Sequence, residues 1–117
     1  MKELSPQLQN QIAQFEQLRQ QLQVLSLQRQ QMEAQLREVE ATLGELEKLG
    51  TDTPLYKSIG NLLVRVEDRE GVKKELSERQ ETLAIRVKTL ERQEKSYAER
   101  YEELSQKIQT ALGPQAG

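Results

Sequence analysis

Apolar residues at heptad spacing constrain the fold of this chain more than any other feature of its sequence. They form two series, one in each half, with steps of mostly four and three residues or of seven. This spacing places them on one stripe of a helix, the seam of a coiled coil, so the sequence predicts two long helices. The first series is Leu8, Ile12, Phe15, Leu18, Leu22, Leu25, Met32, Leu36, Val39, Leu43 and Leu46; the second is Leu76, Leu83, Leu90, Tyr97, Leu104 and Ala111, with Val87, Tyr101 and Ile108 between its members. Arg29, Gln80 and Glu94 interrupt these stripes with polar side chains.

Capping residues set the ends of the two helices. Ser5 and Pro6 are typical of an N-cap and a first helical position, and Gly50 and Gly113 are typical of C-terminal stops. We predict a single domain that consists of a helix over residues 5–49, a connector over 50–67, a second helix over 68–112 and a tail over 113–117. Each helix has about 44 residues, or roughly 65 Å at 1.5 Å per residue.

Matched helices with a short connector favour an antiparallel helical hairpin. The alternative is a long parallel dimer, but its continuous helix would be interrupted at Gly50, Pro54, Gly60 and Gly71. In the hairpin the first turns of the chain lie beside the last turns. We call this end the arm tip, and there the register brings together Leu8, Ile12, Phe15, Tyr101, Leu104 and Ile108.

Composition argues against a compact globule and against catalysis. Only 35% of the residues are hydrophobic and 31% are charged, which suits a coiled coil. There is no cysteine and no histidine, so disulfides and thiolate metal sites are excluded and the commonest general base is missing. No glycine-rich phosphate loop occurs either. We therefore expect no enzyme activity, no bound metal and no cofactor.

Charge and hydropathy exclude further partner classes. The net charge is −2 and no basic block occurs, which argues against a nucleic-acid partner. The chain has no apolar run of about 18 residues and no signal-peptide pattern, so we expect no membrane partner and a cytoplasmic location.

The connector differs from the helical segments, because its residue pattern predicts two short strands. Residues 55–59 and 62–66 are rich in apolar and β-branched side chains, with Gly60 and Asn61 at the bend. A lone β-hairpin is marginal in water. Packing on the ends of its own helices would cover only one face, so we predict that the β-hairpin joins β-hairpins of other subunits. The assembly residues are Leu55, Tyr56, Ile59, Leu62, Leu63, Val64 and Val66.

The strand segment YKSIGNLLVRVE between matched helical arms resembles the prefoldin family, specifically its archaeal β-class subunits. Residues 90–94 (LERQE) and 11–15 (QIAQF) add to this resemblance, which covers essentially the whole chain. It implies a hexamer of two α-class and four β-class subunits, in which the strands form inter-subunit β-barrels. It further implies a chaperone whose arm tips capture unfolded polypeptides and deliver them to a group II chaperonin.

Aromatic residues near the arm tip favour client binding over a passive coiled-coil scaffold with no client of its own. Three of the four aromatics, Phe15, Tyr97 and Tyr101, lie in the terminal parts of the helices. Leu4, Leu8 and Leu112 are expected to stay partly exposed, since two helices shield only inward positions. The predicted client-binding residues are Leu4, Leu8, Ile12, Phe15, Tyr101, Leu104, Ile108 and Leu112.

Overall fold

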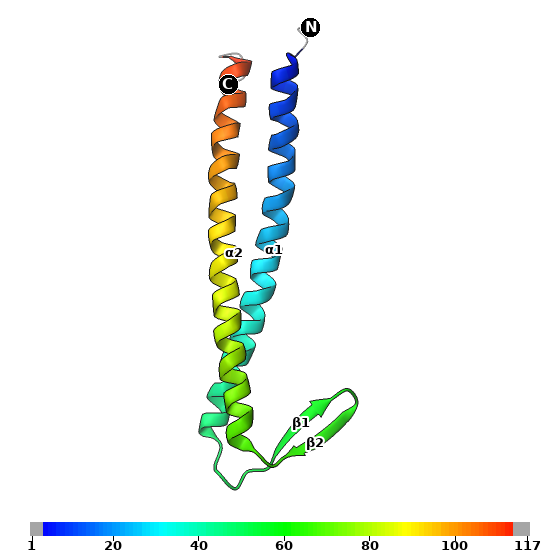
Figure 1. Ribbon diagram of the computed structural model, residues 1–117, viewed down its shortest axis with the longest axis vertical. Coiled ribbons are helices and arrows are strands. Elements are labelled where there is room, and N and C mark those ends of the chain that lie inside the picture. The colour runs from blue at the N-terminus through cyan, green and yellow to red at the C-terminus, as the bar shows by residue number, and fades with distance from the viewer. Residues whose placement is uncertain (1–3, 114–117) are drawn as a thin grey trace. The chain divides into compact units, whose positions relative to one another are not determined.

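The computed structural model describes residues 4–113, which form two helices with a β-hairpin between them (Figure 1). The elements are α1 (Pro6–Lys48), β1 (Leu55–Ile59), β2 (Leu62–Val66) and α2 (Arg69–Leu112). The chain divides into two compact units. We call residues 1–30 with 88–117 the terminal unit, and residues 31–87 the central unit. This mainly helical architecture with one β-hairpin confirms the predicted fold class.

Side-chain caps begin both helices. The Leu8 N–H donates to Ser5 Oγ at 3.1 Å, so that Ser5 is the N-cap of α1 and Pro6 its first residue, as the sequence predicts. At the start of α2, the Gly71 N–H donates to Asp68 Oδ1 at 2.9 Å. Both caps satisfy backbone donors that have no partner inside the helix.

The two helices end differently. Gly113 has a φ of +81°, and its N–H donates to the carbonyls of Gln109 at 3.2 Å and Thr110 at 3.1 Å. That conformation suits a glycine just after a helix, because it carries no Cβ. The helix α1 instead ends at Lys48, and Gly50 accepts a hydrogen bond from the Thr53 N–H at 3.1 Å in the turn that follows. Gly50 does not adopt a positive φ.

The core of the central unit lies between α1 and α2. Val39 and Leu46 of α1 are buried, as are Leu83 and Val87 of α2. All four occupy predicted seam positions. Across the same pair of helices, Lys73 Nζ lies 3.7 Å from Glu47 Oε1, although the carboxylate is largely exposed.

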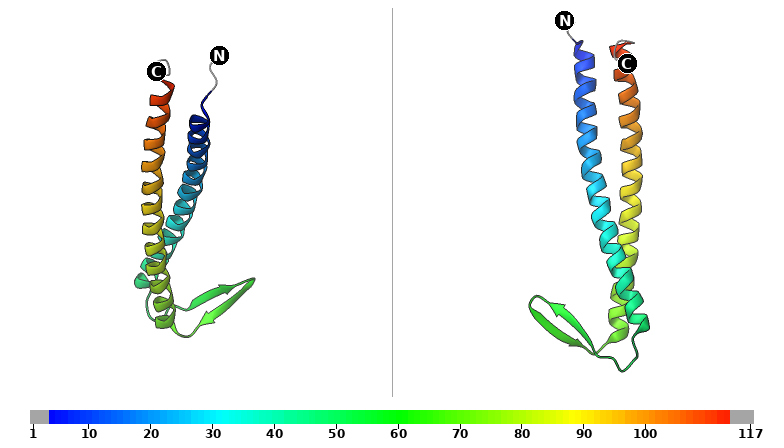
Figure 2. Two further views of the ribbon diagram at one scale, coloured as in Figure 1. Left: turned by 45° about the horizontal axis from the view of Figure 1, so that its top comes forward. Right: turned by 180° about the vertical axis from the view of Figure 1, so that it is seen from behind.

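In the terminal unit, the first part of α1 lies beside the last part of α2 and runs antiparallel to it, as all views show (Figure 2). The rings of Phe15 and Tyr101 stack with their centroids 4.4 Å apart and their planes 24° apart. Stacked aromatic pairs contribute stability beyond the area that they bury. The contact confirms the predicted register, in which the first and last helical turns are neighbours.

The β-hairpin belongs to the central unit and has a two-residue turn. The strands β1 and β2 are antiparallel, with Leu55 opposite Val66 and Ile59 opposite Leu62. Gly60 has a φ of +58°, whereas Asn61 does not have a positive φ. This combination is typical of a type II′ turn, whose twist matches that of the flanking strands.

Candidate subunit-assembly and client-binding surfaces

Strand register gives the β-hairpin two chemically different faces. Cross-strand partners share a face, so one face carries six residues, of which only Lys57 is polar. We call this the apolar face: Leu55, Lys57, Ile59, Leu62, Val64 and Val66. The other face is mixed: Tyr56, Ser58, Leu63 and Arg65. The predicted assembly residues therefore divide into five on the apolar face and two on the mixed face.

Helix ends of the same chain cover little of these faces. Leu55 and Val66, at the base of the β-hairpin, are half-buried, but Leu62 is 66% exposed and Leu63 is 74% exposed. Tyr56 and Ile59 are also more than half exposed. Each strand has, in addition, one edge that pairs with no other strand among the described residues. An exposed apolar sheet with open edges is a template for pairing with another chain.

Two polar contacts connect the β-hairpin segment to α2. Arg69 Nη2 donates to the Thr53 carbonyl at 2.6 Å, at the point where the connector and α2 meet. Lys57 Nζ lies 3.7 Å from Glu75 Oε2, so the one polar residue of the apolar face contacts α2. Both partners of that pair are mostly exposed, so the pair contributes little to stability.

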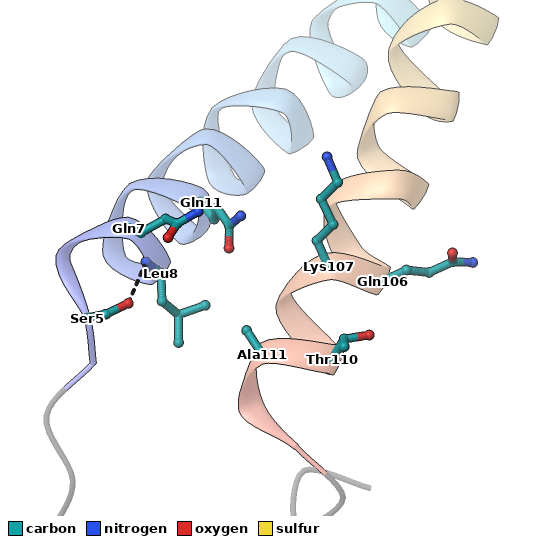
Figure 3. A pocket seen from close by; sticks show the side chains of 8 residues that line it. All are labelled: Ser5, Gln7, Leu8, Gln11, Gln106, Lys107, Thr110 and Ala111. Carbon is teal, nitrogen blue, oxygen red and sulfur yellow. Dashed lines mark hydrogen bonds between the residues drawn. The ribbon is translucent and has the colours of Figure 1, made fainter.

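At the arm tip, α1 and α2 together line a groove of about 500 Å³ (Figure 3). Leu8 points from α1 toward Ala111 of α2; Gln7 and Gln11 lie beside Leu8 on α1, and Gln106 extends from α2 on the side away from α1 (Figure 3). Further along the same unit, a second groove of about 320 Å³ is lined by Ile12, Phe15, Glu16, Ser105, Ile108 and Gln109. Both grooves combine apolar surface with polar groups, and each includes one charged side chain, Lys107 in the first and Glu16 in the second.

The structure corrects the expected exposure of one tip residue. Leu4 and Leu112 are exposed, as predicted, but Leu8 is only 7% exposed, so the expectation that it stays partly exposed is wrong. Leu8 occupies an inward seam position, and the last turns of α2, which end at Leu112 as predicted, pack close enough to cover it. Ile12 and Phe15 are half-buried. The remaining predicted residues, Tyr101, Leu104 and Ile108, are half-buried as well.

Two features of the terminal unit were not predicted from the sequence. Val24 and Leu27 are apolar, lie outside the seam and are more than half exposed. Val24 borders a groove of about 450 Å³ that is also lined by Leu25, Tyr97 and three glutamines. The spacing of Val24 and Leu27 off the heptad stripe is the signal that could have found them. The second feature is an ion pair between Arg29 and Glu94, the two polar residues that interrupt the stripes in this unit.

Other kinds of site find no support in the part of the chain that the structure describes. Over residues 4–113, no group of three or more metal-binding side chains comes together. Within the same residues, neither helix contains a stretch apolar enough to cross a bilayer.

The sequence as a whole matches a known family model. Residues 9–115 match the prefoldin subunit model. The chain belongs to the prefoldin subunit family. It is 54% identical to a prefoldin subunit beta from Archaeoglobus fulgidus over 117 residues, all of both chains. It is 46% identical to a prefoldin subunit beta from Methanosarcina mazei over 114 residues, 97% of each chain.

A solved structure agrees with this assignment. The chain is similar to the prefoldin beta subunit from Thermococcus strain KS-1, with a TM-score of 0.85 and 39% identity. The similarity covers 97% of this chain and 99% of that one. The resemblance to prefoldin β-class subunits is thus confirmed. Membership of the prefoldin family gives the chain a chaperone-associated role and makes it a subunit of a complex with other prefoldin subunits.

Proposed function

We propose that the chain is a subunit of an ATP-independent holdase chaperone that acts in the cytoplasm. The complex would contain two α-class and four β-class prefoldin subunits, with this chain as the β-class subunit. The observation that carries the proposal is the presence of exposed apolar surface on both units of the chain: on the β-hairpin and at the arm tip. One surface joins subunits, and the other remains available for clients.

Assembly uses the β-hairpin. Open strand edges pair with β-hairpins of neighbouring subunits, and closure into a β-barrel removes those edges. The apolar face then turns inward. Leu62 and Val64 become buried against the same face of other subunits, whereas Ser58 and Arg65 on the mixed face stay near water.

Client capture uses the arm tip. Leu4 and Leu112 are exposed there, and the tip groove adds Leu8 and Ala111 beside glutamine amides and Lys107. One tip offers little apolar surface, so its affinity for an unfolded segment is weak. Several tips on one complex hold a client together, and effective concentration raises avidity by about 10²–10⁴. Weak contacts that break one at a time suit transfer to a group II chaperonin without nucleotide hydrolysis.

Tip capture is tested by removing exposed apolar side chains at the tip or elsewhere in the same unit. The tip variant carries Leu4→Ser and Leu112→Ser, and the matched control carries Val24→Ser and Leu27→Ser. All four side chains are exposed, so both variants should fold and assemble normally. We expect light scattering of a refolding client to rise toward the level without chaperone for the tip variant alone. Deletion of residues 1–12 and 105–117 should give the same loss with assembly intact.

The results also separate this proposal from its rival, a passive scaffold. The burial of Leu8 favours the rival, because it reduces the apolar area that a client can reach at the tip. A complex that never suppresses aggregation would establish the scaffold. Suppression that is lost in the control variant and kept in the tip variant would instead move client capture to the side of α1.

A further inference from the structure

The polar residues that interrupt the two heptad stripes in the terminal unit pair with each other. Arg29 Nε donates to Glu94 Oε1 at 2.5 Å, and each side chain is only 23% exposed. Arg29 lies between the seam residues Leu25 and Met32 of α1. Glu94 occupies the equivalent place on α2, between Leu90 and Tyr97. In this unit, two stripes that are otherwise apolar thus meet at a charged contact.

Because the ion pair is largely buried in the seam, it favours one alignment of the two helices over others. A charge that loses most of its contact with water is costly unless a partner is present, so an arrangement that separates Arg29 from Glu94 is penalised at both residues. Apolar residues carry no such penalty, because leucines at heptad spacing pack against other leucines in more than one register. A single polar pair in a seam is known to select register at some cost in stability.

We propose that Arg29 and Glu94 set the register and the partner choice of the arm: they hold α1 against α2 of the same chain in one antiparallel alignment. A shift of one heptad displaces one helix along the other by about 10 Å and leaves both charges among apolar side chains. A parallel pair of two copies would place Arg29 against Arg29 and Glu94 against Glu94. Like charges at such close range disfavour that arrangement.

Alignment matters at the tip because residues of both helices build its groove. Leu8 of α1 and Ala111 of α2 line the same groove, and a shifted register would separate them. Arg29 and Glu94 are therefore positioning residues for the tip. This functional consequence rests on the proposed role of the tip in client capture, whereas the register role does not.

The test reads register directly in the full chain. The chain contains one phenylalanine, so isotope-labelled Phe15 gives one set of ring signals, and its nuclear Overhauser effect to Tyr101 reports the stacked contact. Arg29→Glu alone or Glu94→Arg alone should remove this effect and lower Tm by about 5–10 °C. The exchanged pair, Arg29→Glu with Glu94→Arg, should restore both.

A matched control makes the same charge reversal at an exposed ion pair outside the seam. Arg19→Glu breaks the ion pair of Arg19 with Glu16, which spans 2.9 Å within α1 and is about half exposed. It should leave the Phe15–Tyr101 effect intact and move Tm by about 1 °C or less.

Replacing both charged residues with leucine distinguishes a role in selecting the register from a role in stabilising the helices. With Arg29→Leu and Glu94→Leu we expect Tm to rise while the Phe15 signals split into more than one set, because the seam no longer prefers one alignment. This variant folds even if the single reversals do not. A single, undiminished Phe15–Tyr101 contact in the apolar pair would overturn the proposal.

The suppression of client aggregation, which we call protection, is measured by light scattering on the same variants. Loss of the ring contact together with loss of protection supports both the register role and tip capture. Loss of the ring contact with full protection rejects tip capture and leaves the register role standing.

Discussion

Charge placed on the apolar face of the β-hairpin should abolish the large complex and leave the helices folded. Leu62 and Val64 lie on that face and are 66% and 43% exposed, so Leu62→Lys with Val64→Lys removes only part of the packing of the β-hairpin within one subunit. In the assembled barrel, the same two ammonium groups would have to be buried without partners. The variant should therefore show normal helical circular dichroism but fail to assemble.

The magnitude follows from the exposure of the strand residues. On the apolar face, Ile59, Leu62 and Val64 are between 43% and 66% exposed in the single chain. Complete burial of such a side chain is worth about 1.5–3 kcal/mol, so roughly 2–5 kcal/mol per β-hairpin remains available on assembly through this face. Two unpaired buried charges cost several kcal/mol each in the assembled state. The cost exceeds the gain, and the complex should be lost rather than weakened.

Size-exclusion chromatography with light scattering, on the chain mixed with a prefoldin α-class subunit, measures the outcome. The control variant carries Ser58→Lys and Asn61→Lys, which add the same charge on the mixed face and at the turn. It should assemble like the unmodified chain. A full-size complex formed by the Leu62/Val64 variant would refute the assignment of the apolar face to a buried joint.

Two further predictions concern the stability of the helices, measured by chemical or thermal unfolding. Leu83 is 4% exposed, so Leu83→Ala should cost about 2–4 kcal/mol, whereas Ile85→Ala at an exposed position should cost under about 1 kcal/mol; equal costs would mean that the seam is wrongly placed. Gly44→Ala should stabilise α1 by about 1 kcal/mol, because a Cβ there meets nothing within 4 Å. Gly71→Ala should not stabilise α2, because its Cβ would overlap the capping carboxylate of Asp68; a gain that matched Gly44→Ala would contradict the importance of this cap.

Local patterns in the sequence were sufficient to predict the two helices, the two strands and the antiparallel pairing of each. The heptad stripes predict the two helices, and Ser5 with Pro6 predicts the start of the first. Alternating apolar residues around Gly60 and Asn61 predict the β-hairpin. These features depend on helix and strand periodicity and on turn chemistry, which act over a few residues and are visible without coordinates.

The candidate surfaces were predicted less completely. The sequence indicated that the β-hairpin would be poorly covered, and the exposure of Leu62 and Leu63 agrees. It did not indicate that Leu8 would be buried, although the end of α2 at Leu112 was predicted, because burial depends on how closely the last turns of α2 pack against α1. The exposure of a side chain depends on which other side chains pack against it, and the heptad pattern alone does not specify those contacts.

By itself, then, the sequence determined which segments are helices and strands, where α1 begins and which residues face the seam, since each of these follows from short-range spacing. The antiparallel register at the arm tip was predicted as well, but only the tertiary structure decided which individual side chains along the seam make direct contact. Arg29 and Glu94 stood out as isolated polar interruptions 65 residues apart, and nothing in either local pattern connects them. The fold brings them together because α1 and α2 pack antiparallel, so that the part of α1 that contains Arg29 lies opposite the part of α2 that contains Glu94. Two unfavourable residues thereby become one specific contact.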